Sequence, residues 1–284
     1  MMRYFFYYLL FAIIVIVILF PMLWTFSLSI KTHSDITASV PKFIFEPTTK
    51  NYRGLFTGET GTTSLPSSKP NFPRYFLNGI VISGGATLLA LLLGIPAAYA
   101  LTRARFKKES SRENIAFTIL SFWFGPELAI VLPLYQIYQR AGLIDTYWGL
   151  ILVYQLIAVP FVVWMCRSYF LDIPVSIEEA SRVDGCSHSQ TFFRVVLPLA
   201  KGGIAATALL AFIFCWNSFV FALVVCGEKT MPVTTGSLGF IRYQAVLWGQ
   251  MSAAIIISAL PAIVLAILLQ KHIVRGLTFG SVKE

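Results

Sequence analysis

Charged side chains are scarce in this sequence. Asp, Glu, Lys and Arg make up 12% of the 284 residues, hydrophobic residues make up 57%, and the mean hydropathy is +0.74. Soluble domains carry roughly 25% charged residues, so the composition excludes an ordinary soluble fold and favours a membrane protein. The 22 basic residues exceed the 13 acidic ones, but they lie between long apolar runs, where they set membrane orientation and do not form a nucleic-acid surface.

Residue types that build catalytic and metal centres are also few. We expect neither a metal site nor a disulfide framework, because the histidines are far apart and the cysteines show no C-x-x-C spacing. The sequence has no H-E-x-x-H or G-x-S-x-G motif, which argues against an intramembrane enzyme. It also lacks G-x-x-x-x-G-K-[ST], so any ATP must be hydrolysed by a separate chain. The residues concerned are His33, His188, His272, Cys166, Cys186, Cys215 and Cys226.

Six apolar runs are long enough to cross a bilayer, which needs roughly 17 to 25 residues in a helix. Backbone polar groups in lipid must be paired within their own segment, so these runs are predicted to be helices and the fold to be an all-α polytopic membrane protein. The first run is too long for a signal peptide and is expected to remain as an anchor. Pro96, Pro126, Pro133, Pro160 and Pro261 are expected to kink or interrupt the helices. The runs are 9–28, 76–101, 115–138, 147–169, 203–226 and 251–270.

Basic residues predict the orientation of the chain. Lys and Arg occur in residues 101–115, 171–202 and the C-terminal tail, whereas the short loop after Tyr138 holds only Arg140. Residues 29–75 carry six further basic residues, which count against this orientation, but long loops weigh less in setting it. By the positive-inside rule, both termini are predicted to be cytoplasmic in a bacterial-type inner membrane. Residues 29–75 are then an extracytoplasmic loop, and their Pro, Thr, Ser and Gly content predicts little regular structure.

A polar segment, residues 172–201, separates the fourth and fifth runs and carries helix signals. Ser176 and Glu179 fit a capping box at the start of a short helix. Gly185 suits the left-handed residue that closes such a helix, and Ser187 or Ser189 can cap a second helix that Pro198 ends. We therefore predict a helix-turn-helix along the inner membrane face, with a small apolar surface rimmed by charges that suits docking to another protein.

The same segment resembles the EAA loop of ATP-binding-cassette importer permeases. The matching residues are Glu179-Ala180-Ser181, Gly185 and Val195-x-Leu197-Pro198, with Ser and Val in place of the usual Ala and Ile. The longer stretch 179–187 is similar to the carbohydrate-uptake branch, where the pattern commonly reads EAA-x-x-DGAS. Residues 143–149, Trp216-Asn217 and 274–283 are similar to the second permease subunit of maltose-type systems, so the resemblance covers residues 75–284.

This resemblance implies one transmembrane permease domain over residues 1–284, with the six helices of a type I importer permease. It also implies a second permease as heterodimer partner, two copies of an ABC ATPase subunit and an extracytoplasmic solute-binding protein. ATP and Mg would be held by the ATPase, and this chain would bind no cofactor of its own. The coupling contacts carried over from the family fall on Glu179, Ala180, Ser181, Asp184, Gly185, Leu197 and Pro198.

Polar and aromatic residues inside the apolar runs are candidates for the solute pathway. Glu127 is the acidic residue placed most clearly in hydrocarbon, where a carboxylate usually faces a cavity or a partner. The others also fit helix packing or interfacial anchoring, which leaves both interpretations open. The candidates are Glu127, Asn78, Trp123, Gln155, Trp216 and Asn217. A permease for a non-carbohydrate solute and an ion-coupled secondary transporter remain as alternative functions.

Overall fold

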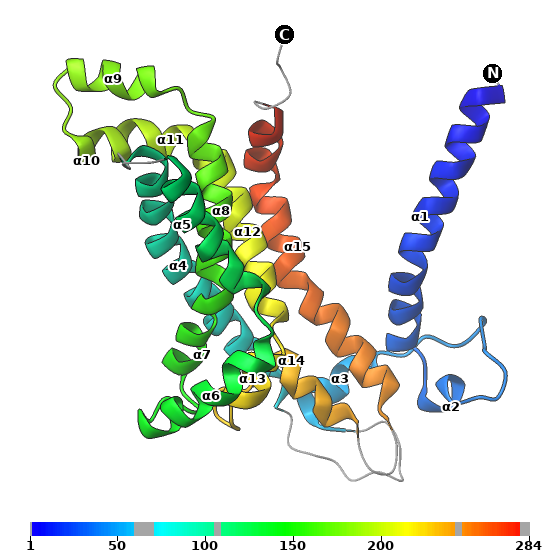
Figure 1. The fold of residues 1–284 in the computed structure, drawn as a ribbon. Coiled ribbons are helices and arrows are strands. Elements are labelled where there is room, and N and C mark those ends of the chain that lie inside the picture. The colour runs from blue at the N-terminus through cyan, green and yellow to red at the C-terminus, as the bar shows by residue number, and fades with distance from the viewer. Residues whose placement is uncertain (1, 60–70, 105–108, 242–245, 279–284) are drawn as a thin grey trace. The chain divides into compact units, whose positions relative to one another are not determined.

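The computed structural model describes residues 2–59, 71–104, 109–241 and 246–278 (Figure 1), and their regular structure is helical apart from one isolated bridge between Ile241 and Val246. The α-helices are α1 (Met2–Ser29), α2 (His33–Ile36), α3 (Lys50–Thr57), α4 (Phe72–Arg103), α5 (Glu109–Ser121), α6 (Glu127–Arg140), α7 (Tyr147–Val153), α8 (Gln155–Leu171), α9 (Val175–Val183), α10 (His188–Thr191), α11 (Leu197–Leu199), α12 (Lys201–Asn217), α13 (Val220–Val225), α14 (Val233–Gly236) and α15 (Trp248–Thr278). The segments η1 (Phe122–Phe124) and η3 (Ser237–Phe240) are 3-10 helices, and η2 (Phe192–Val196) is a π-helix. The predicted all-α fold is confirmed.

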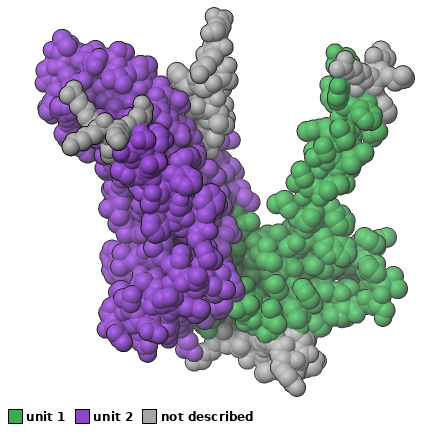
Figure 2. Space-filling view, viewed as in Figure 1, with its two compact units in different colours: residues 1–76, 236–260 green, residues 77–235, 261–284 purple. Residues whose placement is uncertain are grey.

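The chain divides into two compact units. Unit 1 contains residues 1–76 and 236–260, and unit 2 contains residues 77–235 and 261–284 (Figure 2). Part of the predicted extracytoplasmic loop, residues 60–70, lies outside the described residues, as do Arg105, Lys107, Lys108 and Lys283, which contributed to the predicted orientation.

Three helices are long and apolar enough to cross a membrane, and the number rises to six if each bent helix pair counts as one span. The three are Phe6–Ser29, Phe72–Arg103 and Trp248–Gln270, which correspond to the first, second and sixth predicted runs. The pairs are Ser110–Phe124 with Glu127–Arg140, Tyr147–Val153 with Gln155–Leu171, and His188–Leu199 with Lys201–Asn217.

The third predicted run is not one straight span. Its two halves meet at 86°, at Gly125 and Pro126. Pro126 has no amide hydrogen and its ring disfavours helical backbone at the residue before it, and Gly125 accordingly adopts an extended conformation with ψ 141°. The expected interruption at Pro126 is therefore confirmed, but as a full change of direction. The fifth run is also interrupted, because Ser218 leaves the helical conformation after α12.

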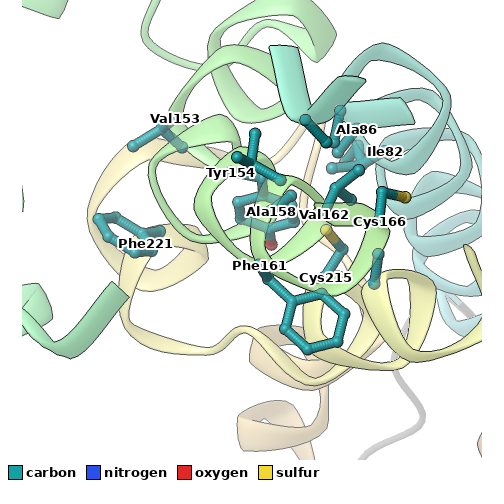
Figure 3. Packing of buried hydrophobic residues seen from close by; sticks show 14 of the residues in the cluster. Ile82, Ala86, Val153, Tyr154, Ala158, Phe161, Val162, Cys166, Cys215 and Phe221 are labelled. Carbon is teal, nitrogen blue, oxygen red and sulfur yellow. The ribbon is translucent and has the colours of Figure 1, made fainter. Parts of the chain in front are cut away.

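The core of unit 2 forms where α4, α8 and α12 approach closely. Small residues line the contact, including Ala86 on α4 and Ala158 on α8, both almost fully buried (Figure 3). Ala90 on α4 is buried as well. Gly94 lies so close to α8 that an added Cβ would come 2.6 Å from a Val162 methyl carbon. Small side chains let helix backbones approach, which is the usual basis of helix association in lipid. Cys166 and Cys215 are buried in this core as free thiols, in agreement with their interpretation as small apolar residues.

In unit 1 the segment after α1 has more regular structure than the sequence predicts. The amide of Asn51 on α3 donates to the carbonyl groups of Ser29 and Lys31, at 2.9 and 2.8 Å. The hydroxyl groups of Tyr52 and Ser29 are 2.8 Å apart. The Gln250 amide of α15 donates to the Glu59 carbonyl and lies against Gly54 of α3. The short helix α3 therefore joins the end of α1 to the start of α15.

This packing predicts that Gly54→Ala destabilises unit 1. A Cβ at position 54 would collide with the Glu59 carbonyl and the Gln250 side chain. Overpacking of this kind costs about 1–3 kcal/mol, so the thermal unfolding midpoint in detergent should fall. The matched control is Gly84→Ala in α4, where an added Cβ meets nothing within 4 Å. Equal midpoints for the two variants would contradict the close contact at Gly54.

Candidate functional site

The predicted helix-turn-helix is present as α9 followed by α10, η2 and α11. Ser187 caps the second helix through a capping box: its hydroxyl accepts from the Gln190 amide at 3.3 Å, and its own amide donates to Gln190 Oε1 at 2.8 Å. Helices α9 and α10 contact each other at one end of unit 2 (Figure 1). The second helix extends one residue past Pro198, to Leu199, so the prediction that Pro198 ends it is wrong by one position.

The predicted capping box at the start of α9 is also wrong. The helix begins at Val175 with Pro174 as the N-cap residue, and among the described residues no side chain caps it. Pro174 has φ −58° and ψ 132°, which leads the chain directly into the first helical residue. Ser176 is therefore already the second residue of the helix, two positions past the N-cap.

The end of α9 is a Schellman motif centred on Gly185. Gly185 has φ +86°, its amide donates to the Arg182 carbonyl at 3.1 Å, and the Cys186 amide donates to the Ser181 carbonyl at 3.0 Å. An added Cβ at Gly185 would meet nothing within 4 Å. Glycine is therefore favoured here by the backbone conformation and not by lack of space.

The residues carried over from the EAA loop fall on different faces of this helix pair. Glu179, Ala180, Asp184 and Gly185 are exposed, as is Pro198, whereas Leu197 is half-buried against the core. Val183 and Phe193 add exposed apolar area, at 87% and 62%. Ser181 is buried, and its hydroxyl lies 2.8 Å from that of Thr191, which connects α9 to α10. The helix pair thus has an exposed outer face that carries both charged and apolar side chains. On its inner face, α9 is hydrogen-bonded to α10.

Glu178, which the sequence analysis passed over, is the buried carboxylate of this inner face. It accepts hydrogen bonds from the Tyr99 hydroxyl at 2.8 Å and from Arg103 Nε at 2.6 Å, and its side chain is 8% exposed. The neighbouring Glu179 is 63% exposed and lies 3.9 Å from Arg182. Successive helical residues point about 100° apart, so two adjacent glutamates have opposite environments. Removing one partner of a buried ion pair costs about 3–5 kcal/mol.

A second ion pair, between Arg167 of α8 and Glu113 of α5, was also missed. The Arg167 side chain is 9% exposed, inside the fourth predicted run, and Nη2 contacts the carboxylate of Glu113, which is 51% exposed. Ionisable residues at membrane depth usually pair in this way. Arg167 was the available signal, because it is a basic residue inside an apolar run.

The pathway candidates with amide side chains all bond to backbone carbonyl groups. Asn78 donates to Lys229 and Met231, at 3.1 and 3.0 Å, and accepts from the Tyr147 hydroxyl at 2.7 Å. Gln155 donates to Ala86 and Ile151, at 3.1 and 2.7 Å, and Asn217 donates to Ile213 at 2.9 Å. This geometry fits helix packing, the alternative considered for these residues.

The other three pathway candidates lie apart from these bonds. Trp123 packs edge-on against Phe214, with ring centroids 5.5 Å apart, and Trp216 stacks on Phe212. Glu127 is half-buried in the first turn of α6, directly after the break at Pro126, where a carboxylate is favoured by the helix dipole. Within the described ranges, no three His, Cys, Asp or Glu side chains lie close enough to share a metal ion.

Residues 90–279 match the model of the family described as binding-protein-dependent transport system inner membrane component. The chain belongs to this family. It is similar to the trehalose transport system permease protein SugB of Mycobacterium tuberculosis, with 35% identity over 93% of this chain and 92% of that protein. It is also similar to the trehalose/maltose transport system permease protein MalG of Thermococcus litoralis, with 32% identity over 93% of this chain and 91% of that protein.

The fold has a counterpart among solved structures. A chain from the crystal structure of a bacterial ABC transporter that imports the acidic polysaccharide alginate superposes with a TM-score of 0.74, at 22% identity, over 95% of this chain and 96% of the other. The predicted type I importer fold is confirmed. The protein is a multi-pass inner-membrane permease subunit of an ABC importer, and the ATPase of such a system is a separate subunit.

At the end of unit 2 away from α9, the side chain of Asp145 binds the loop between α13 and α14. Its carboxylate accepts from the amides of Gly227, Lys229 and Thr230, at 3.0, 3.2 and 2.9 Å, and from the Thr230 hydroxyl at 2.7 Å. Burial alone raises the pKa of Asp145, but the hydrogen bonds from Thr230, Lys229 and Gly227 outweigh it and hold the pKa below its ordinary value. The loop fixed by Asp145 is the one whose carbonyl groups bind Asn78.

This lowered pKa predicts an acid-sensitive stability. A carboxyl group whose folded-state pKa is depressed stabilises the fold above its unfolded pKa of about 3.9, and the stabilisation is lost as pH falls through the folded value. Asp145→Asn keeps a residue that tolerates the observed φ of +54°. It should cost on the order of 1 kcal/mol at neutral pH, since the carboxylate is partly exposed.

Unfolding midpoints measured from pH 7 to pH 3 check this prediction. The Asp145→Asn profile should be flatter than that of the unmodified permease. Glu228→Gln, an exposed position in the same loop, is the matched control and should leave the profile unchanged. Identical pH profiles for the Asp145→Asn variant and the unmodified permease would contradict the role of the carboxylate.

Proposed function

We propose that the outer face of the helix pair α9–α11 docks on a separate ATPase subunit and couples ATP hydrolysis to solute movement. The observation that carries this proposal is the opposite placement of the two faces. Glu179, Ala180 and Asp184 are exposed beside apolar Val183, while Glu178 and Ser181 fasten the same helix to the bundle. A helix anchored on one face and open on the other suits a contact that transmits rigid-body displacement.

The arrangement of basic residues supports a cytoplasmic position for this helix pair. Arg103 lies at the end of α4 that meets α9, next to the basic segment predicted to be inside, and Arg182 and Arg194 lie on the pair itself. The opposite end of unit 2 holds Asp145 and the loop that it binds. This charge asymmetry favours the predicted orientation, with both termini in the cytoplasm.

We further propose that the solute is a sugar or a sugar-like molecule. Similar permeases are named for trehalose and maltose, and they match over more than nine-tenths of the present chain. In the proposed assembly, this permease pairs with a second permease, and an extracytoplasmic binding protein delivers the solute. Two ATPase subunits hold ATP and Mg, and this chain binds no cofactor. Residues 29–75 would face the extracytoplasmic side, and membrane lipid would surround the spans.

Among the pathway candidates, Glu127 and Trp123 are the best placed to meet such a solute. Neither side chain is fully buried, and they lie on the two sides of the break at Gly125 and Pro126. Sugar rings offer hydroxyl groups to a carboxylate and an apolar face to an indole ring. The described bonds of Asn78, Gln155 and Asn217 to backbone carbonyl groups make them weaker candidates.

Purification of the tagged permease in a gentle detergent, followed by mass spectrometry, tests the assembly. We expect a P-loop ATPase and a second six-helix permease to be recovered with it. Recovery of this chain alone, with ion-driven uptake of trehalose or maltose retained after reconstitution, would overturn the proposal in favour of a secondary transporter.

The turn at Gly185 gives a sharper test of coupling. Gly185→Val places a β-branched residue at φ +86° and should distort the end of α9. We expect the variant to insert normally. Binding protein loaded with trehalose or maltose should stimulate its ATP hydrolysis about tenfold less than that of the unmodified complex, which corresponds to a loss of roughly 1.4 kcal/mol in coupling free energy. Gly185→Asn is the matched control, because asparagine tolerates a left-handed backbone. Full stimulation of ATP hydrolysis in the valine variant would contradict the proposed coupling role of α9.

A further inference from the structure

The buried carboxylate of Glu178 lies where three helices meet. Its two oxygens have different donors: Oε2 accepts from the Tyr99 hydroxyl and Oε1 accepts from Arg103 Nε. Both donors belong to the last two turns of α4, and Glu178 belongs to the first half of α9. With only 8% of the Glu178 side chain and 16% of the Arg103 side chain exposed, water has little access to the pair.

Arg103 also binds the end of a third helix. Its Nη2 donates to the carbonyl groups of Phe170 and Ile173, at 3.0 and 2.8 Å. Phe170 lies in the last turn of α8 and Ile173 lies just after it, so the guanidinium caps the C-terminal end of this helix, where the Phe170 carbonyl also accepts from the Ile173 amide. One planar fork therefore connects the end of α4, the end of α8 and the carboxylate of α9.

Aromatic packing encloses this junction. The Tyr99 ring lies 4.7 Å from that of Phe192 and 5.7 Å from that of Phe170, measured between centroids. Phe192 begins η2, so the second helix of the pair also contacts Tyr99. A low-dielectric surrounding strengthens a fully bonded ion pair and makes an unpaired member of it costly.

Within α9, the buried contacts are separate from the exposed ones. Glu178 and Ser181 are three residues apart and so share one face, and Ser181 bonds to Thr191 of α10. Glu179, between them in sequence, points outward. Glu178 and Ser181 thus link the inner face of α9 by hydrogen bonds to α4 and α10.

We propose that Glu178, held by Arg103 and Tyr99, is a positioning residue that makes α9 move as one body with the ends of α4 and α8. This inference rests on the proposed coupling function and adds a residue outside the set carried over from the EAA loop. A displacement of α9 relative to α4 would separate a buried carboxylate from two donors and is resisted. A displacement imposed on α9 is accordingly passed to two membrane-spanning helices.

Spin-label distances in the assembled complex test this proposal. The labels are placed at Ser176→Cys on α9 and Leu93→Cys on α4, both exposed and outside the proposed docking face, in a chain with Cys186→Ser. The distance is measured without nucleotide and after trapping with ATP and vanadate. We expect the wild-type pair to give one narrow distance that nucleotide does not change, and Glu178→Ala to lose it, with a broadened and shifted distribution in the trapped state.

A matched control is Glu113→Gln. This change removes the ion-pair partner of Arg167, which is not in α9, and should preserve the narrow distance. If Glu178→Ala does not assemble, Glu178→Gln and Arg103→Lys replace it, since both keep side-chain size and each removes part of the fork. A single unchanged distance in the Glu178 or Arg103 variants, or a nucleotide-dependent distance in the wild type, overturns the proposal. A wild-type preparation with no ATPase and no ATP hydrolysis instead contradicts the proposed function, and the positioning role falls with it.

Discussion

The close approach of α4 to α8 is the contact on which the rest of unit 2 depends. Apolar area gives no preference for another helix over lipid inside a membrane, so association relies on shape. Gly94 on α4 supplies that shape, because it leaves room for Val162 of α8, and Gly85 does the same for Ile151 of α7. The ends of α4 and α8 then lie near enough for one arginine to bridge them. A bulkier α4 surface would separate the backbones and, with them, the site that holds α9.

The sequence predicted the helices well because the dominant constraint is local. A long apolar run must pair its own backbone groups, so run length alone located the first, second, third, fourth and sixth candidate spans to within a few residues. The fifth predicted run, 203–226, instead continues past the end of α12 at Asn217. Gly185 and Ser187 were predicted for the same reason, since left-handed closure and N-capping depend on neighbouring residues. Direction was not predictable in this way. Whether Pro126 bends a helix slightly or turns it by 86° depends on what packs against each half.

The buried ion pairs were missed because their partners are distant in sequence. Arg103 and Glu178 are 75 residues apart, and Arg167 and Glu113 are 54 apart. The motif drew attention to Glu179, and an adjacent glutamate looked redundant. Helical periodicity separates the two, since only one of them shares a face with Ser181. The hydrogen bonds of Asn51 in unit 1 were not predicted either. Residues 29–75 are rich in turn-forming residues, and their composition did not indicate that a short helix would connect α1 to α15.

The broken spans bear on the order in which the chain inserts. Helices α1, α4 and α15 are long enough to cross lipid on their own, and the apolar window of α1 buries nothing within the described chain. By contrast, α7, the first half of one bent pair, has 7 residues, too few to be stable as an isolated helix. The long helices can therefore enter the bilayer independently, whereas the bent pairs need neighbours already in place. Synthesis proceeds from α4 toward α8, so a finished α4 surface is available as the template on which the later, broken spans are completed.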